Sequence, residues 1–330
     1  MKRVKALAVV TAIQAVLLVA AIVACVLLVP GLLGLNAGDM PPTVVLGDED
    51  TLHNGLAQVT DFGATPDDDR DDTAAFKAAL KTGASVYIPG GKYNISENLT
   101  VSDRILKGAG NTTLCFTSPS AGLTLEGSAI LYELGLTFSD KALDKGDCVA
   151  VTDGGMTAGS LIRGVTFQKV GTGIKSHRER GTFCATIESV TFKDYKKEAI
   201  SISDGLSTII RSATVYAGGE NTPITLGGNV TVDSLSFEGV TAKAALALEN
   251  CHSASINSLH FSEVKADTLV SCSGARFTLK SATLASTTAD SLVAVADKEG
   301  AIASAGRIIT VNGDIKISDS DSIVCNQHFK

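Results

Sequence analysis

Leu134-Gly-Leu-Thr-Phe138, Arg163-Gly-Val-Thr-Phe167 and Glu188-Ser-Val-Thr-Phe192 begin a series of similar short runs that decides the fold of this chain. The series continues with Ser212-Ala-Thr-Val-Tyr216, Asp233-Ser-Leu-Ser-Phe237 and Asn257-Ser-Leu-His-Phe261. Their final aromatic residues lie 29, 25, 24, 21 and 24 residues apart. Self-similarity at such a period indicates a repeat architecture, in which each unit is buried by stacking on its neighbours. The aromatic residues are therefore predicted to form one interior row.

A second apolar position recurs in step with the first. It predicts another interior row, made of Val149, Ile174, Ile200, Ile224, Leu246, Leu269 and Leu292. Each repeat thus holds two or three short alternating strands, separated by turns of Gly, Asp, Asn or Ser, and no helical period interrupts them. This pattern fits an all-β chain folded as a parallel β-helix, whose coils stack about 4.8 Å apart. The alternative is a β-sandwich whose strands share the spacing by accident.

The composition of the chain agrees with a narrow solenoid interior. Aromatic residues are 5% of the chain and Trp is absent, whereas small and β-branched residues, which stack well in rows, are plentiful. A hydrophobic content of 45% and a net charge of −7 indicate a folded chain without the basic surface of a nucleic-acid binder. We therefore expect no nucleic acid among its partners.

The N-terminal segment is predicted to cross a membrane. Residues 6–35 are apolar except for Thr11 and Gln14, with three basic residues before them and acidic residues after them. A helix of about 20 apolar residues spans a bilayer, and its basic side stays in the cytoplasm. We expect a cytoplasmic N-terminus over 1–5, a single-pass transmembrane signal-anchor over 6–35, a linker over 36–57 and an extracellular β-helix at the cell membrane. A cleaved signal peptide and lipidation at Cys25 are the alternatives.

Residues 58–110 carry a second set of motifs. They are Gln58-Val-Thr-Asp-Phe-Gly-Ala64, the acidic run from Asp67 to Asp72, Val86-Tyr-Ile-Pro-Gly-Gly-Lys-Tyr-Asn-Ile95 and Ile105-Leu-Lys-Gly-Ala-Gly110. Their order resembles the start of the pectate lyase superfamily domain of rhamnogalacturonase-like, polygalacturonase-like and tailspike proteins. The resemblance implies a right-handed, single-stranded parallel β-helix of the pectin-lyase-like kind. It assigns the cap and first coils to 58–110, further coils to 111–330, and a polysaccharide or cell-surface glycan as partner. The family usually has Asp-Gly where this chain has Asp67-Asp68.

The acidic run at the start of this region has two interpretations. Asp71 and Asp72 begin a short amphipathic helix, where carboxylates satisfy free N–H groups. Phe76, Ala79 and Leu80 form its apolar face, which would cover the first coil as a solenoid cap must. Alternatively the five aspartates bind calcium, which prefers carboxylate oxygens. No cofactor is otherwise evident, and Ca²⁺ would be expected only if the protein is a lyase.

The catalytic motifs of polygalacturonase-type hydrolases, Asn-Thr-Asp, Asp-Asp and Gly-His-Gly, do not occur in the repeats. A glycosidase would need two carboxylates, and a lyase would need a strong base beside a uronate. Ionisable residues near the second strand run are the candidates: Lys175, His177, Arg178, Asp194, Lys197 and Glu198. Their other interpretation is a set of solvated turn residues.

Two functions follow from these observations. The first is a membrane-tethered extracellular protein that binds or degrades a polysaccharide as a lyase or a glycoside hydrolase. The second is a non-catalytic surface adhesin or cell-envelope scaffold of the same fold, which the missing motifs favour. Cys251 and Cys272 lie nearly one coil apart and could form a disulfide, or remain free thiols that fill the interior.

Overall fold

The structure is a computed structural model that describes residues 55–176, 183–219, 221–275, 277–295, 303–311, 314–315 and 323–325. His53–Lys330 belong to one compact unit. The predicted transmembrane segment 6–35 and most of the predicted linker lie outside the described residues. No helix within the described ranges has the length and apolar character needed to cross a membrane.

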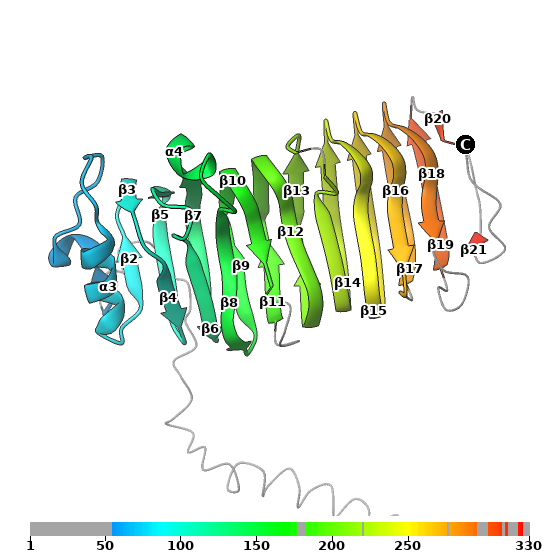
Figure 1. The fold of residues 1–330 in the computed structure, drawn as a ribbon. Coiled ribbons are helices and arrows are strands. Elements are labelled where there is room, and N and C mark those ends of the chain that lie inside the picture. The colour runs from blue at the N-terminus through cyan, green and yellow to red at the C-terminus, as the bar shows by residue number, and fades with distance from the viewer. Residues whose placement is uncertain are drawn as a thin grey trace, which may run out of the picture. The chain divides into compact units, whose positions relative to one another are not determined.

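The elements of this unit are η1 (Val59–Phe62) and α3 (Thr73–Lys81) near its N-terminal end, a long series of strands, and a further short helix, α4 (Asp140–Leu143), inserted between β7 (Ile130–Phe138) and β8 (Val149–Thr157) (Figure 1). The strands of the first coils are β1 (Ala57–Gln58), β2 (Val86–Ile88), β3 (Gly91–Ile95), β4 (Leu99–Ser102), β5 (Ile105–Phe116), β6 (Leu123–Gly127), β7 (Ile130–Phe138), β8 (Val149–Thr157) and β9 (Ser160–Arg163). The later strands are β10 (Thr166–Lys175), β11 (Phe183–Glu188), β12 (Val190–Ile210), β13 (Ala213–Tyr216), β14 (Ile224–Glu238), β15 (Thr241–Ser262), β16 (Lys265–Ser273), β17 (Phe277–Ala285), β18 (Thr288–Val295), β19 (Ala303–Val311), β20 (Asp314–Ile315) and β21 (Ile323–Cys325).

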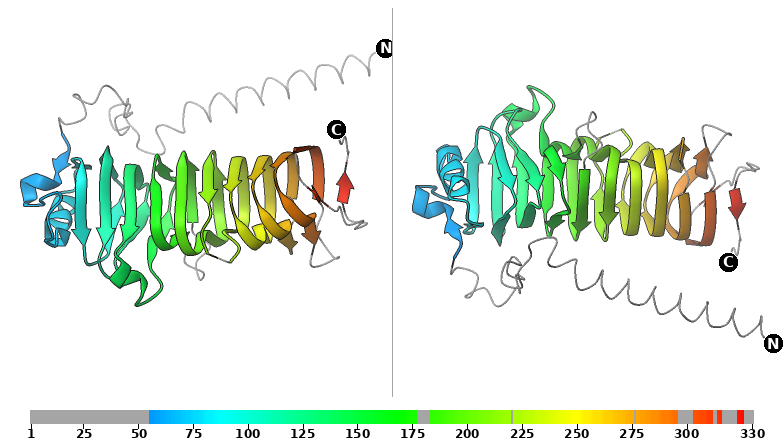
Figure 2. Two further views of the ribbon diagram at one scale, coloured as in Figure 1. Left: turned by 90° about the horizontal axis from the view of Figure 1, so that it is seen from above. Right: turned by 90° about the horizontal axis from the view of Figure 1, so that it is seen from below.

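The strands stack in parallel into three faces, which confirms the predicted parallel β-helix (Figure 2). Face A contains the aromatic runs, from β3 through β5 and β7 to the end of β15. Face B contains the second predicted run, from β4 through β6 and β8 to β16. Face C contains β2, the start of β5 and β7, β9 and β11. The chain visits the faces in the order C, A, B within each coil, so long strands such as β12 turn a corner.

The interior row of face A is close to the predicted one, with two corrections. Phe167 stacks on Phe192 with ring centroids 4.7 Å apart, and Phe237 stacks on Phe261 at 5.2 Å. Phe138, however, packs on Phe116 at 5.0 Å, because Phe167 is in register with Leu136 instead. Tyr216 is not in the row either. Val215 lies between Phe192 and Phe237, and Tyr216 points outward beside Lys193, whose Nζ is 5.0 Å from its ring centroid.

The interior row of face B is also shifted at both ends. Ile174, Ile200, Ile224 and Leu246 are in register as predicted. Before Ile174 the row contains Val151 instead of the predicted Val149. After Leu246 it contains Val270 and Val293 instead of the predicted Leu269 and Leu292. Leu269 and Leu292 are buried as well, since the chain buries consecutive residues as it enters face B. Buried and exposed residues do not alternate at this point, so the sequence pattern could not show which of two adjacent buried residues is in register with the row.

Left-handed backbone conformations make the sharp corners between faces. At the corner from face A to face B, the second residue after the interior position has a positive φ: 53° at Lys169, 54° at Asp194, 66° at Gly239 and 56° at Glu263. Side chains with a short polar group tolerate this region better than most, and glycine adopts it without cost. Asp194 therefore has a structural reason to stand where it does.

The N-terminal cap covers the first coil as predicted, but only Asp71 of the two predicted aspartates accepts a hydrogen bond from an N–H group of α3. Phe76, Ala79 and Leu80 of α3 are buried, and the Phe76 ring meets Tyr93 of the first coil edge-on at 5.5 Å. The Asp72 carboxylate accepts hydrogen bonds from the backbone N–H groups of Thr65 and Asn94, at 2.9 and 3.2 Å. Asp71 accepts from the N–H of Thr73 and the hydroxyl of Ser96. The acidic run thus ties the cap to the coil.

A continuous row of charged and aromatic side chains runs along the outside of face C. Tyr87, Lys107, Tyr132 and Arg163 occupy one register position on successive coils. The Lys107 ammonium and the Arg163 guanidinium lie 5.4 and 5.7 Å from the centroid of the Tyr132 ring. Glu188 then pairs with Arg163 at 3.7 Å and with Arg211 at 3.1 Å. These contacts join successive coils outside the interior rows, and the Lys107 side chain among them is itself buried.

Candidate functional site

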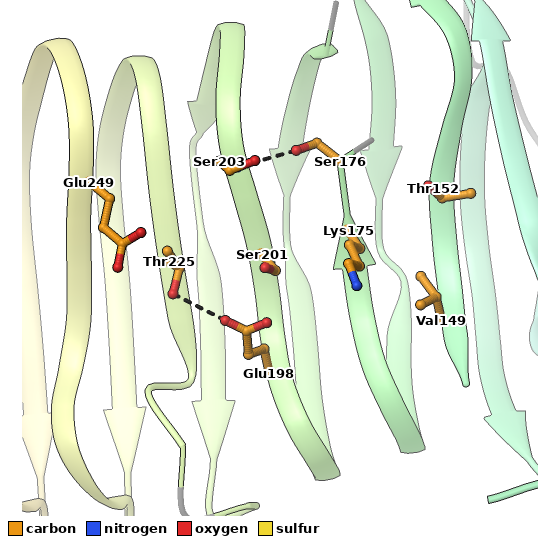
Figure 3. Close-up of a pocket in the computed structure, with 9 residues that line it drawn as sticks. All are labelled: Val149, Thr152, Lys175, Ser176, Glu198, Ser201, Ser203, Thr225 and Glu249. Carbon is orange, nitrogen blue, oxygen red and sulfur yellow. Dashed lines mark hydrogen bonds between the residues drawn. The ribbon is translucent and has the colours of Figure 1, made fainter. Parts of the chain in front are cut away.

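A groove of about 650 Å³ lies on the outer surface of face B, across the middle coils (Figure 3). All but one of its lining residues are of polar or charged type: Val149, Thr152, Lys175, Ser176, Glu198, Ser201, Ser203, Thr225 and Glu249. The side chains come from β8, β10, β12, β14 and β15, which are neighbours in the stack. The groove therefore runs along the solenoid axis, across successive coils.

The floor of the groove follows from strand alternation. Thr152, Lys175, Ser201 and Thr225 each come directly after an interior residue of face B, and successive side chains of a strand point to opposite faces. Each is in register with the next, from Thr152 to Lys175, Ser201 and Thr225. Three hydroxyls and one ammonium thus form a row along the floor, one group per coil, at the coil spacing of about 4.8 Å.

Two carboxylates lie at the edges of the groove. Glu198 is in register with Thr172, three residues before the floor, and its Oε1 accepts a 3.1 Å hydrogen bond from the Thr225 hydroxyl. Glu249 lies at the opposite edge, two coils further along. Figure 3 shows the two carboxylates on either side of Thr225. Two carboxylates that flank a bound sugar can act as general acid and as base or nucleophile.

Lys175 differs from the nearby lysines because it has no carboxylate partner among the described residues. Lys169 pairs with Asp140, Lys196 with Asp144 and Lys197 with Asp147. Lys175 stands on the floor between Thr152 and Ser201, and in Figure 3 its ammonium lies between Glu198 and Val149. Its charge remains available to a ligand in the groove.

The structure separates the predicted site residues into three groups. Lys175 and Glu198 line the groove together. Asp194 lies at the corner between faces A and B, where it lines two shallower pockets of about 690 and 490 Å³. Lys197 faces away from the groove, and its hydrogen bond holds the pKa of the Asp147 carboxyl below its usual range. His177 and Arg178 lie outside the described residues.

Sequence reasoning missed most of the groove. Ser201, Thr225 and Thr152 carried a usable signal, because each follows an interior position of face B, as Lys175 does. Ser203 and Glu249 carried the same signal one interior position later, since they directly follow Ile202 and Leu248, two buried residues that are in register through Leu226. Within the described residues, no group of three or more His, Cys, Asp or Glu side chains is arranged to hold a metal ion.

Solved structures that resemble this chain are all parallel β-helix proteins with low identity. The catalytic unit of an α-1,3-glucanase from Streptomyces thermodiastaticus matches with a TM-score of 0.51 and 14% identity, over 84% of this chain and 68% of that one. The A-module of a mannuronan C-5 epimerase from Azotobacter vinelandii gives 0.46 and 13%, over 82% and 99%. The tailspike protein of an Acinetobacter baumannii phage gives 0.44 and 12%, over 79% and 55%. At 14% identity, the likeness to the glucanase supports the fold alone.

Comparison with curated protein sequences gives no match. A family model gives one: the rhamnogalacturonase A/epimerase, pectate lyase-like model matches residues 56–266, which is more than half of the chain. The match begins at the N-terminal cap and includes every residue that lines the face B groove. Its description agrees with the parallel coils and with the cap motifs over 58–110. The chain belongs to the rhamnogalacturonase A/epimerase, pectate lyase-like family.

Proposed function

We propose that this protein binds a polysaccharide chain along the face B groove and cleaves it there by acid–base chemistry. The observation that carries the proposal is the groove itself. It brings together two carboxylates, a floor of hydroxyls at coil spacing, and a lysine that has no carboxylate partner within the part of the chain that the structure describes. Membership of a family described by polysaccharide-acting enzymes supports the same substrate class.

Each groove residue has a role that its chemistry allows. Glu198 is oriented by the Thr225 hydroxyl, and we assign it the role of base or nucleophile. Glu249, at the other edge, is then the general acid that protonates the leaving oxygen. Lys175 binds an acidic or hydroxyl group of the sugar between them. The hydroxyls of Thr152 and Ser201 bind neighbouring sugar units along the floor.

The test is to incubate the full chain with uronate-containing and neutral polysaccharides and to measure both reducing ends and unsaturated ends. Hydrolysis produces reducing ends alone, whereas a lyase also produces an unsaturated sugar. We expect Glu198→Gln and Glu249→Gln to reduce the rate at least 100-fold, the lower range for loss of a general acid or base. Lys243→Met and Glu238→Gln, both exposed outside the groove, should leave the rate unchanged. No new ends on any substrate would rule out the catalytic part of the proposal.

A non-catalytic adhesin or envelope scaffold is the second candidate. The floor row continues beyond the groove through Ala247, Ser271 and Ala294, which form a surface of small side chains without ionisable groups. Such a surface can bind a glycan or a partner without reacting with it. Binding without cleavage would select this candidate.

We also propose that the protein is held at the cell membrane by residues 6–35 with the β-helix outside. The support is the sequence pattern of that segment. Resistance of the full chain to alkaline extraction from membranes, together with its digestion by protease added outside intact cells, checks both parts.

A further inference from the structure

An insertion that contains three aspartates and two lysines, Lys141 and Lys145, lies against the corner between faces A and B. Residues 139–148, which we call the strap, leave face A after β7, form α4 and return to face B at β8 (Figure 1). Ser139 caps α4 by accepting a hydrogen bond from the Ala142 N–H at 3.3 Å. Ala142, Leu143 and Cys148 are buried, so the backbone of the strap is a fixed part of the fold.

Three aspartates of the strap each meet a lysine from the next two coils. Asp140 pairs with Lys169 at 2.8 Å, Asp144 with Lys196 at 3.4 Å, and Asp147 with Lys197. We call these three lysines the lysine corner. Lys196 also donates to the Leu143 carbonyl at the end of α4, at 3.3 Å.

The lysine at position 169 is poorly suited to its backbone. Its φ of 53° lies in the left-handed region, which glycine adopts freely and a lysine does not. Gly239 occupies the same corner position on a later coil. The geometry of the corner therefore gives no reason for a lysine, whereas a requirement for positive charge does.

The three pairs are exposed enough to exchange partners. The lysine side chains are 48%, 51% and 48% exposed, and their aspartate partners are 79%, 76% and 69% exposed. Ion pairs this open to water are weak and are screened by salt. The hydrogen bond from Lys169 lowers the pKa of Asp140, and the same contact raises the pKa of Lys169, so both groups are charged at neutral pH. An anionic ligand could replace the aspartates at little cost.

We propose that the lysine corner is a binding site for a polyanionic glycan, and that the strap carboxylates occupy it as an intramolecular competitor. The corner adjoins the face B groove, because Lys197 directly precedes Glu198 and the strap leads directly into Val149. A chain with repeated carboxylate or sulfate groups can extend from the groove onto the corner. The inference predicts polyanion binding whether or not the groove cleaves a sugar.

The test compares binding of polygalacturonate, dextran sulfate and neutral dextran to variants of the full chain by calorimetry. Asp140→Asn, Asp144→Asn and Asp147→Asn together should tighten binding of the two polyanions on the order of tenfold at low ionic strength, because three weak intramolecular pairs no longer compete. The gain should shrink as salt is added. Neutral dextran should show no change, and the polyanion that gains more identifies whether carboxylate or sulfate is the preferred group.

A matched variant controls for the change in net charge. Asp69→Asn, Asp267→Asn and Asp290→Asn remove three exposed carboxylates elsewhere and should have a much smaller effect. Lys169→Gln, Lys196→Gln and Lys197→Gln should abolish the gain. An equal gain in the matched variant, or unchanged polyanion binding in the lysine variant, overturns the proposal. If near-UV circular dichroism shows that a triple variant is misfolded, polyanion binding is measured instead in a double-mutant cycle of Asp147→Asn and Lys197→Gln. The proposal then requires that Asp147→Asn tightens binding only when Lys197 is present.

Discussion

At the scale of single residues, burial determines what the cysteines can do. Cys251 and Cys272 are almost fully buried and are free thiols, so the disulfide considered from their spacing is not formed. The Cys251 thiol donates to the Leu226 carbonyl at 3.3 Å, and the Cys272 thiol to the Ala275 carbonyl at 3.5 Å. Burial, and then the nearby Cys272, raise the pKa of Cys251 from 9.0 to about 12. Both residues fill the interior as small apolar side chains do.

This pKa predicts a loss of stability in alkali. The folded-state pKa of Cys251 is above its unfolded value, so its contribution is complete below pH 9.0 and disappears as the pH rises toward about 12. We expect the free energy of urea unfolding to decrease over that range, and the thiol to be unreactive toward iodoacetamide in the native protein at neutral pH. Cys251→Ala should flatten the slope, although Tyr93, with a pKa raised to about 12 by burial, leaves part of it. Rapid alkylation of native Cys251 would contradict this account.

The aromatic row shows which residues could be predicted from the sequence. Phe192, Phe237 and Phe261 were correctly placed inside because their runs alternate cleanly. Tyr216 was wrongly placed, since a β-branched valine beside it fits the narrow interior and the phenol gains a cation above its ring. A pattern of residue types cannot decide between two adjacent apolar residues when either could face inward.

At the scale of elements, the close approach of successive coils depends on particular glycines. Gly228 has a φ of 78°, and a Cβ at that position would lie 2.0 Å from the Gly205 carbonyl oxygen of the adjacent coil. Gly110 has a similar φ of 83°, but nothing lies within 4 Å of the same added atom. The two glycines thus share a backbone conformation and differ in the space around them.

This pair allows the two costs to be measured separately. Gly110→Ala should destabilise the protein by about 1–2 kcal/mol, the penalty for a left-handed L-residue. Gly228→Ala should cost a further 1–3 kcal/mol or more, because the two coils must move apart. Urea unfolding of both variants is the measurement. Equal losses would mean that the coils separate freely at this point.

The arrangement of strands, corners and the strap determined which residues of the candidate site could be predicted from the sequence. Lys175 and Glu198 could be chosen from their position relative to a predicted strand, and the groove brings them together. Asp194 was chosen by the same rule, but a corner with a positive φ directs it to another surface. The partner of Lys197 lies on the strap, 50 positions earlier in the chain. Nothing in the local sequence of Lys197 indicates that contact.

At the scale of the whole molecule, the strands of each coil pair with those of the neighbouring coils, the strap reaches two coils further, and the cap closes one end. Stability in such a solenoid is close to a sum of coil and interface terms, so a defect has local effects. Phe76 is fully buried between α3 and the first coil. Phe237 is equally buried in the middle of the stack.

Removal of either ring should expose different parts of the chain. Phe76→Ala and Phe237→Ala should each cost about 3–5 kcal/mol, as large-to-small changes in a core do. Hydrogen exchange should accelerate first in β2 and β3 for Phe76→Ala, and first in β13 to β15 for Phe237→Ala. If both variants lose protection evenly over all described strands, the solenoid unfolds as one unit and the nearest-neighbour description is wrong.

The floor of the groove has a consequence for how the protein can change over generations. Its side chains occupy one outward position per coil and take no part in the interior rows. Duplication of a single coil would therefore lengthen the track by one position and leave every existing position intact. Substitution along the track would alter what is recognised without disturbing how the chain folds. The ligand specificity of the groove can therefore change by single substitutions while the fold is conserved.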